Sequence, residues 1–283
     1  MKTLFTKRTL ARSVSAALAG GVVLVVATML PQEATAGIAL TKHNLGTTGI
    51  AANVTNTFSG TGEICVFCHT PHGGDTSASV PLWNRTLPAA STFTTYNSLG
   101  TSSLDGAIAP VGSVSIACLS CHDGTQAMNV MINAPGSGVT GDLAFTTGTW
   151  TGPAATAGTV GSLGYASIVN IGKDLKNDHP VGVQYGGGGQ NATTPGGAFN
   201  DPDFKATTNK TLNGQLVWWV DTGTAGRQKT DMMLYSRNES TVTGGLQPFV
   251  ECASCHDPHT SAQPTFLRIA NTGSAVCLAC HDK

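Results

Sequence analysis

The chain has 283 residues, a formal net charge of −1, 35 glycines and eight cysteines. Only 11% of its residues are charged, whereas ordinary soluble domains are roughly 25% charged. Nothing in this balance suggests the basic face that nucleic-acid binding requires, so we expect no nucleic-acid partner.

Residues 1–36 have the pattern of a cleaved signal peptide. Basic residues precede an apolar stretch at 16–30, and Ala-Thr-Ala at 34–36 forms an A-x-A cleavage site. The alternative is a transmembrane anchor, but the stretch is shorter than the usual span of about 20 residues and Pro31 follows it. We therefore expect cleavage before Gly37, export of the chain, and no transmembrane segment in the mature protein.

All eight cysteines fall into four C-x-x-C-H motifs. The motifs are Cys65-Val-Phe-Cys68-His69, Cys118-Leu-Ser-Cys121-His122, Cys252-Ala-Ser-Cys255-His256 and Cys277-Leu-Ala-Cys280-His281. This is the attachment pattern of c-type haem, in which both thiols bond to the porphyrin and the histidine ligates the iron. Two intervening residues place both sulfur atoms on one helical turn.

Two other readings of the cysteine pairs fit less well. A zinc knuckle needs no histidine fixed beside each pair, and a thioredoxin-like redox motif occurs once, in a βαβ setting. The four repeats predict four covalently bound haem c groups. Because covalent haem attachment takes place outside the cytoplasm, this agrees with the expected leader.

Four histidines lie outside the motifs, and they equal the expected irons in number: His43, His72, His179 and His259. We predict that they are the distal ligands, opposite the proximal His69, His122, His256 and His281. Methionine is the alternative distal ligand, and the mature chain offers Met128, Met131, Met232 and Met233. The last two lie in an apolar strand and are expected to pack in a core.

Two of the motifs continue as C-x-x-C-H-x-P-H, which places His72 and His259 three residues after a proximal histidine. A link this short cannot pass around the porphyrin edge, so each should ligate a neighbouring haem. We expect His72 at the second haem, His259 at the fourth, His179 at the third and His43 at the first. Ligation by His43 of an iron in a neighbouring subunit is the open alternative, because the segment around it has little to hold it in place.

The fold class predicted is mostly coil, with short helices and a few short strands, in a single domain wrapped around four haems. Residues 37–283 form the tetrahaem domain: a two-haem segment at 37–123, a haem-free wrap at 124–251 and a second two-haem segment at 252–283. Short helices should carry the motifs within 112–124 and 274–283. The apolar runs QLVWWV and DMMLYSR predict one hairpin in the haem-free segment.

The motif segments CVFCHTPHGG, CASCHDPHTS and SLDGAIAPVGSVSIACLSCHDG resemble the doubled C-x-x-C-H multihaem cytochromes of metal-reducing and sulfate-reducing bacteria. KNDHPVGVQY around His179 and TKHNLG around His43 resemble segments that supply distal ligands in that family. The haem count, the leader and the long uncharged middle are most similar to the extracellular tetrahaem filament-forming cytochromes of metal-reducing bacteria. Residues 124–170 and 185–250 match no known pattern.

These observations predict an electron carrier and not an enzyme, because a six-coordinate iron has no position for a substrate. We expect electron transfer through four closely packed bis-histidine haems, in a chain that polymerises into an extracellular or cell-surface conduit. The alternatives are a monomeric periplasmic or surface shuttle, and a multihaem reductase with an open haem site. The expected partners are redox proteins or extracellular electron acceptors, and further copies of the chain.

Overall fold

The computed structural model describes residues 37–49, 57, 61–125, 130–136, 140–144, 169–223, 226–242 and 244–282. The chain divides into two units, Met1–Thr35 and Ala36–Lys283, and every described residue belongs to the second. The expected signal peptide lies outside the described residues, as does part of the expected haem-free wrap. Within the described ranges, no helix combines the length and the apolar character needed to cross a membrane.

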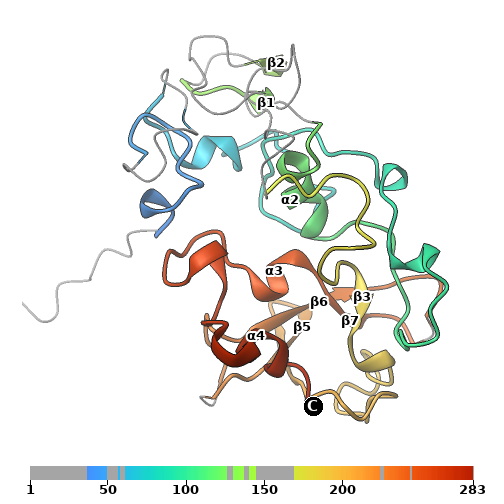
Figure 1. The fold of residues 1–283 in the computed structure, drawn as a ribbon. Helices are drawn as coiled ribbons and strands as arrows, with labels where there is room; N and C mark the ends of the chain where they lie inside the picture. Colours follow the sequence, from blue (N-terminus) through green and yellow to red (C-terminus); the bar gives the residue numbers. More distant parts are fainter. Residues whose placement is uncertain are drawn as a thin grey trace, which may run out of the picture. The chain divides into compact units, whose positions relative to one another are not determined.

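The helices are short, and three of them carry haem-attachment motifs (Figure 1). They are α2 (Ser115–His122), α3 (Cys252–Cys255) and α4 (Ala275–Leu278). Single 3-10 turns are η1 (Gly37–Leu40), η3 (Cys65–Phe67), η4 (Ala90–Thr92), η5 (Tyr96–Ser98), η6 (Tyr185–Gly187), η7 (Pro264–Phe266) and η8 (Thr272–Ser274). The expectation that short helices carry the motifs within 112–124 and 274–283 is confirmed by α2 and α4.

A five-stranded antiparallel sheet occupies the C-terminal half of the chain, with strand order β3-β7-β6-β5-β4. Its strands are β3 (Val183–Gln184), β4 (Thr208–Leu212), β5 (Gln215–Val220), β6 (Met232–Arg237) and β7 (Gln247–Val250). The predicted hairpin is confirmed by β5 and β6, which pair antiparallel. The sheet extends beyond that hairpin, because β4 and β7 pair with its outer edges. A separate two-stranded sheet joins β1 (Val130–Asn133) to β2 (Thr140–Ala144).

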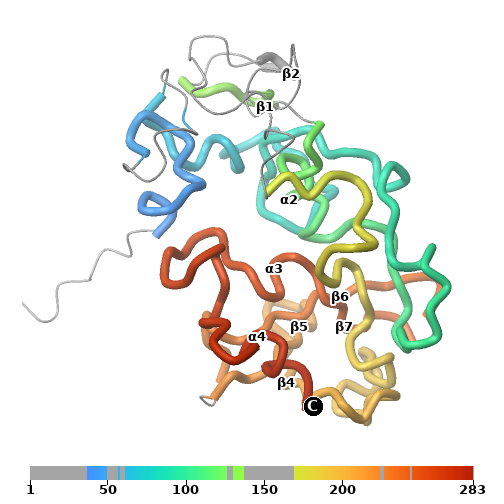
Figure 2. The backbone as a smooth tube through the Cα atoms, viewed as in Figure 1, coloured from blue at the N-terminus to red at the C-terminus, as the bar shows by residue number. Residues whose placement is uncertain are grey.

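One face of the large sheet carries a hydrophobic core. Side chains two apart on a strand point to the same face, and Trp218 and Val220 of β5 meet Met232 and Leu234 of β6 in this core. Met232 is fully buried there, which confirms its predicted packing role. Ala279, which directly follows α4, packs against the same cluster, and Figure 2 shows the C-terminal segment crossing beside these strands.

Two further core clusters surround the first two motifs. The larger one contains Trp83, Leu119 of α2 and Leu175, and the partly buried Cys68 and Cys252 pack against it. The smaller one consists of Leu45, Phe67 and Met131, with Cys68 and Cys121 packed against it. Attachment cysteines therefore lie at the edges of the cores, where thiols can reach a group outside.

Truncating Trp218 to alanine should strongly destabilise the sheet. Its side chain is fully buried in the core cluster, and removing a buried tryptophan typically costs about 3–5 kcal/mol. Chemical denaturation followed by tryptophan fluorescence and circular dichroism measures the change in unfolding free energy.

Leu212→Ala in β4 is the matched control, because that side chain is 41% exposed. Its effect should stay within about 0.5 kcal/mol. Equal losses for the two variants would contradict the burial of Trp218.

Candidate haem sites

Each C-x-x-C-H motif forms a single turn that presents its cysteines and histidine together. In three motifs the histidine N–H donates to the carbonyl oxygen of the first cysteine: His69 to Cys65 at 2.8 Å, His256 to Cys252 at 3.2 Å and His281 to Cys277 at 3.0 Å. The second motif is part of helix α2. All eight cysteines have free thiols. The local geometry is therefore the one that covalent attachment needs, with both sulfur atoms available on one turn.

Three of the four proximal histidines are oriented by a backbone carbonyl. Nδ1 of His69 lies 2.6 Å from the Pro81 oxygen, Nδ1 of His122 lies 2.7 Å from the Val169 oxygen, and Nδ1 of His256 lies 2.7 Å from the Thr265 oxygen. A carbonyl oxygen accepts only, so Nδ1 carries the proton and Nε2 keeps its lone pair. This second hydrogen bond is typical of histidines that ligate metals.

The structure places three proximal histidines opposite three of the remaining histidines. Ring centroids are 6.3 Å apart for His69 and His259, 6.1 Å for His122 and His43, and 6.1 Å for His256 and His179. Two imidazoles that share one metal ion, each bonded at about 2 Å, place their centroids roughly 6 Å apart. The three pairs therefore have the separation that a haem iron between them requires.

These pairs differ from the arrangement expected from the sequence for three of the four distal histidines. His72, which we expected at the second haem, is not the histidine beside His122. His43 lies beside His122 of the second motif, although we expected it at the first. His259 lies beside His69 of the first motif, although we expected it at the fourth. His179 lies beside His256, as expected. That His259 serves a motif other than its own agrees with the argument from its short proline-containing link.

The position of His43 follows from contacts that its N-terminal segment makes. Its ring stacks on Phe266, with centroids 4.3 Å apart and planes inclined by 16°. Nearby, Asn44 is fully buried and donates to the Ala39 oxygen at 3.1 Å. The segment is thus tied down, contrary to our expectation, and His43 lies next to His122, the predicted proximal ligand of the second motif in its own chain. Trans ligation by His43, the alternative considered from the sequence, does not agree with this geometry.

Burial keeps three of these histidines in the neutral form that binds metal. It lowers the pKa of His43 from 6.5 to about 3, with His122 and His259 contributing as nearby like charges. Burial likewise lowers the pKa of His122 and of His256, against the opposing effect of their carbonyl hydrogen bonds. Neutral imidazole offers the lone pair that iron needs.

Two distal histidines are positioned by neighbours that sequence reasoning missed. Asp257 Oδ1 accepts the backbone N–H of His259 at 3.0 Å and lies 3.3 Å from its Nδ1. Tyr96 donates its hydroxyl to the backbone oxygens of Asp178 and His179. Asp257 stands inside the motif C-H-D-P-H, where its spacing from His259 could have indicated an orienting role. Tyr96 is 83 residues from His179 and leaves no local pattern.

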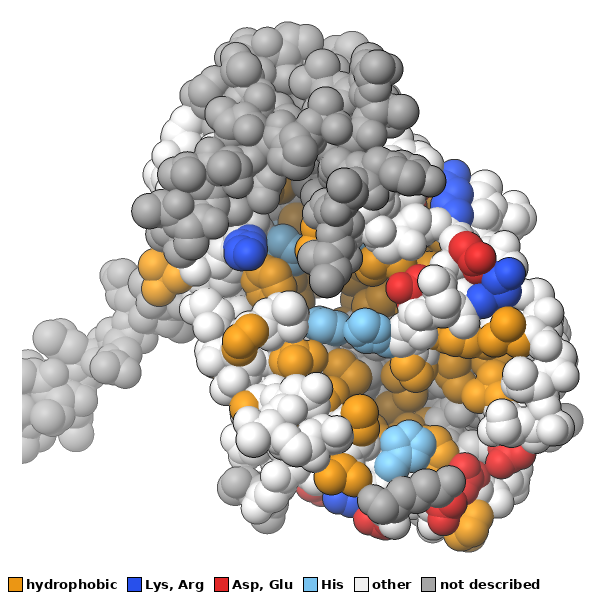
Figure 3. All heavy atoms as spheres, viewed as in Figure 1, with side chains coloured by type: hydrophobic (Ala, Val, Ile, Leu, Met, Phe, Trp, Pro, Cys, Tyr) orange, Lys and Arg blue, Asp and Glu red, His pale blue; other side chains and the backbone are white. Residues whose placement is uncertain are grey.

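Two histidines remain outside the three pairs. His72 is exposed, and among the described residues no ring contact or side-chain hydrogen bond engages its imidazole. The ring of His281 contacts Phe204, with centroids 4.2 Å apart, but no second histidine faces it within the described chain. Figure 3 shows histidine side chains at the surface of one face, bordered by hydrophobic side chains.

The attachment cysteines of successive motifs lie close together. Cys118 and Cys252 form a side-chain hydrogen bond, which raises the pKa of Cys118 and lowers that of Cys252. Cys68 and Cys121 share one core cluster, and Cys255 and Cys280 share another. Haems attached at these cysteines would therefore be neighbours in the order of their motifs along the chain, from the first to the fourth.

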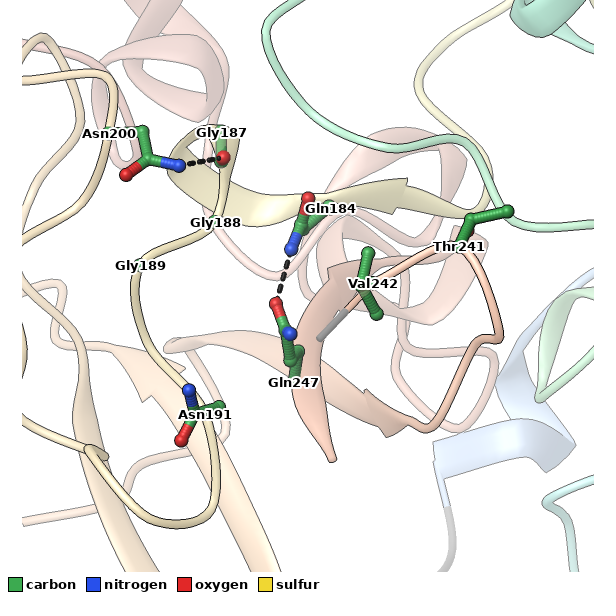
Figure 4. Close-up of a pocket in the computed structure, with 9 residues that line it drawn as sticks. All are labelled: Gln184, Gly187, Gly188, Gly189, Asn191, Asn200, Thr241, Val242 and Gln247. Atoms are coloured by element: carbon green, nitrogen blue, oxygen red, sulfur yellow. Dashed lines mark hydrogen bonds between the residues drawn. The ribbon is translucent and has the colours of Figure 1, made fainter. Parts of the chain in front are cut away.

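A pocket of about 360 Å³ has a polar lining that differs from the haem sites (Figure 4). It is lined by Gln184, Gly187, Gly188, Gly189, Asn191, Asn200, Thr241, Val242 and Gln247. The amide of Gln184 donates to that of Gln247, and Asn200 donates to the Gly187 oxygen at 2.8 Å. With no histidine or cysteine in its lining, the pocket is not a haem site.

The comparisons with known proteins agree with this chemistry. A family model described as a doubled CXXCH motif matches residues 247–283, which hold the third and fourth motifs. No match was found among curated proteins. The motifs indicate covalently bound c-type haem, and the match supports a multihaem c-type cytochrome, a class of electron carriers that is typically exported.

Proposed function

We propose that the chain is a tetrahaem cytochrome that polymerises into an extracellular electron conduit, with each junction completed by His72. In this arrangement His72 of one subunit ligates the fourth haem iron of the next subunit, opposite His281. The observation that carries the proposal is the set of three intrachain histidine pairs at 6.1–6.3 Å. These pairs contain six of the eight histidines. The two that remain are His72, a predicted distal ligand, and His281, a predicted proximal ligand.

The exposure of the two remaining sites supports a contact between copies. His72, Cys277 and Leu278 are all exposed, and Leu278 of α4 leaves 41% of its surface open. The surfaces that carry His72 and His281 differ, so their contact is heterologous. A heterologous contact that does not close into a ring generates a filament.

The succession of attachment sites supports conduction within each subunit. The haems supply one-electron chemistry when bound, and the attachment cysteines of neighbouring motifs lie close together. Ligation by two histidines leaves the iron no open position and gives a lower potential than methionine–histidine ligation. A low potential suits electrons delivered to poor extracellular acceptors or to redox partner proteins.

The chief alternative is a monomeric shuttle in the periplasm or at the cell surface. The same four haems would serve it, but His72 and His281 would then lack their partners. A reductase that uses the fourth haem as an open site is the third possibility, and the same unpaired His281 would favour it.

Native protein, purified with its haems, distinguishes these functions. Electron microscopy should show filaments, and resonance Raman spectra of the filaments should show only low-spin haem. After dissociation to monomers, one haem in four should become high-spin. Monomers in the native preparation that are fully low-spin would contradict both the junction and the open-site reductase. High-spin haem in monomers that never assemble would favour the reductase.

A further inference from the structure

A buried ionic cluster lies where the second and third haem-attachment helices meet. Glu251 precedes Cys252, and its side chain is completely buried. One of its oxygens accepts from Arg237 Nη1 at 2.8 Å, and the other accepts from the Ser115 hydroxyl. Ser115 opens α2 and also accepts the N–H of Cys252 at 3.0 Å.

The same carboxylate caps helix α3. Its side chain accepts the backbone N–H of Ser254, while its own N–H donates to Ser254 Oγ at 2.9 Å. Donors therefore approach the carboxylate from Arg237, Ser115 and Ser254. Burial raises the pKa of Glu251, whereas the Ser115 hydrogen bond and the Arg237 ion pair lower it and favour the ionised, acceptor-only form.

The cluster carries a net negative charge. Arg237 binds two carboxylates, Glu251 and, through Nε at 2.7 Å, Glu239. The side chains of Arg237 and Glu239 keep only 10% and 19% of their surfaces exposed. Tyr235 also interacts with this region, and beside it lie one further cation, Arg268, and one further anion, Asp257, whose charges offset each other. One cation between two anions leaves one negative charge, and solvent screens little of it.

The attachment cysteines place this charge beside two haems. Cys252 follows Glu251 directly, and its sulfur atom lies close to that of Cys118 in α2. Reduction of a haem adds an electron, and a nearby fixed negative charge opposes that step. Charge and burial around a haem are among the features by which a protein sets its potential.

We propose that Glu251, held by Arg237 and Ser115, lowers the reduction potentials of the second and third haems relative to the first and fourth. Glu251 acts as a positioning residue for α3 and as a fixed charge, without touching the iron ligands. The inference rests on haem attachment at the second and third motifs, and it is independent of filament assembly.

Glu251→Gln tests the charge while keeping an oxygen that can cap α3. Spectroelectrochemical titration of the holoprotein should show two of the four potentials shifted upward and the other two unchanged. Asp105→Asn removes an exposed carboxylate and should shift none of them. Intact mass establishes first that the variant carries four haems, and resonance Raman establishes that their spin states match those of the wild type. A failure of the haem assignment would therefore be detected separately from a failure of this proposal.

Glu239→Gln covers the case in which the first variant fails to fold. This variant removes the other carboxylate that binds Arg237, and Glu239 is more exposed than Glu251. The potentials of the same two haems should therefore shift upward by less. Unchanged potentials in both variants, or equal shifts in all four haems, would overturn the proposal. A loss of thermal stability without a change in potential would show that Glu251 only caps α3.

Discussion

Replacing His72 by alanine is expected to abolish filaments while leaving all four haems attached. The C-x-x-C-H residues are untouched by this change, and the exposed His72 ring makes no ring contact or side-chain hydrogen bond among the described residues. Its loss should therefore cost the monomer little stability. Electron microscopy should show monomers, and resonance Raman should show one high-spin haem.

His43→Ala is the matched control, because it also removes one distal histidine. Its ring lies beside His122 of its own chain, so the second haem should lose a ligand while filaments still form. Filaments that persist in His72→Ala and disappear in His43→Ala would reverse the assignment of the junction. Intact mass confirms four haems in both variants before the particles are compared.

The motif turns and one β-hairpin were predictable from the sequence because their sequence patterns are local. The turns that carry the motifs follow from the C-x-x-C-H spacing, and the β5–β6 hairpin follows from two apolar runs separated by a polar turn. The outer strands could not be predicted. β4 has mostly exposed polar side chains and β3 has two residues, so both depend on pairing with the hairpin and its neighbour, not on their own propensity.

The histidines of the site could be listed from the sequence, but their pairing could not. The proximal residues follow from the motif, and the distal candidates follow from counting. Which histidine faces which motif depends on long-range packing such as the stacking of His43 on Phe266, 223 positions later in the chain. The orienting carbonyls of Pro81, Val169 and Thr265 are backbone atoms, and any residue type could supply them.

The pairing also changes what each doubled motif does. C-x-x-C-H-x-P-H around His259 connects the first and third sites within one chain, whereas among the described residues no second histidine faces the imidazole of His72. The two elements differ between histidines, with Thr70 in one and Asp257 in the other. Asp257 holds the imidazole of His259 close to its own backbone, while Thr70 instead donates its hydroxyl to the His72 backbone oxygen at 3.0 Å. The ring of His72 thus lacks the carboxylate that lies beside the ring of His259.

Lowering the pH from about 6.5 towards 3 is expected to destabilise the folded protein through His43. Burial lowers the pKa of His43 from 6.5 to about 3, so in this window the unfolded chain binds a proton that the folded chain does not. Stability therefore rises with pH across the window and is lost as the pH falls through it. At about 1.4 kcal/mol per pKa unit, the loss attributable to His43 approaches roughly 4–5 kcal/mol at the acid end. The lowered pKa of His122 adds a loss of the same sign.

Glu251 opposes this trend, because burial raises its pKa and its contribution to stability grows as the pH falls through that raised value. A variant that isolates His43 is therefore needed. His43→Met removes the titrating imidazole but keeps a side chain that can ligate haem iron. Denaturant unfolding at a series of pH values should give a steep acid loss for the wild type and a flatter profile for the variant. Parallel profiles would show that His43 is not buried as a neutral imidazole, and the pairing of His43 with His122 would then lose its electrostatic support.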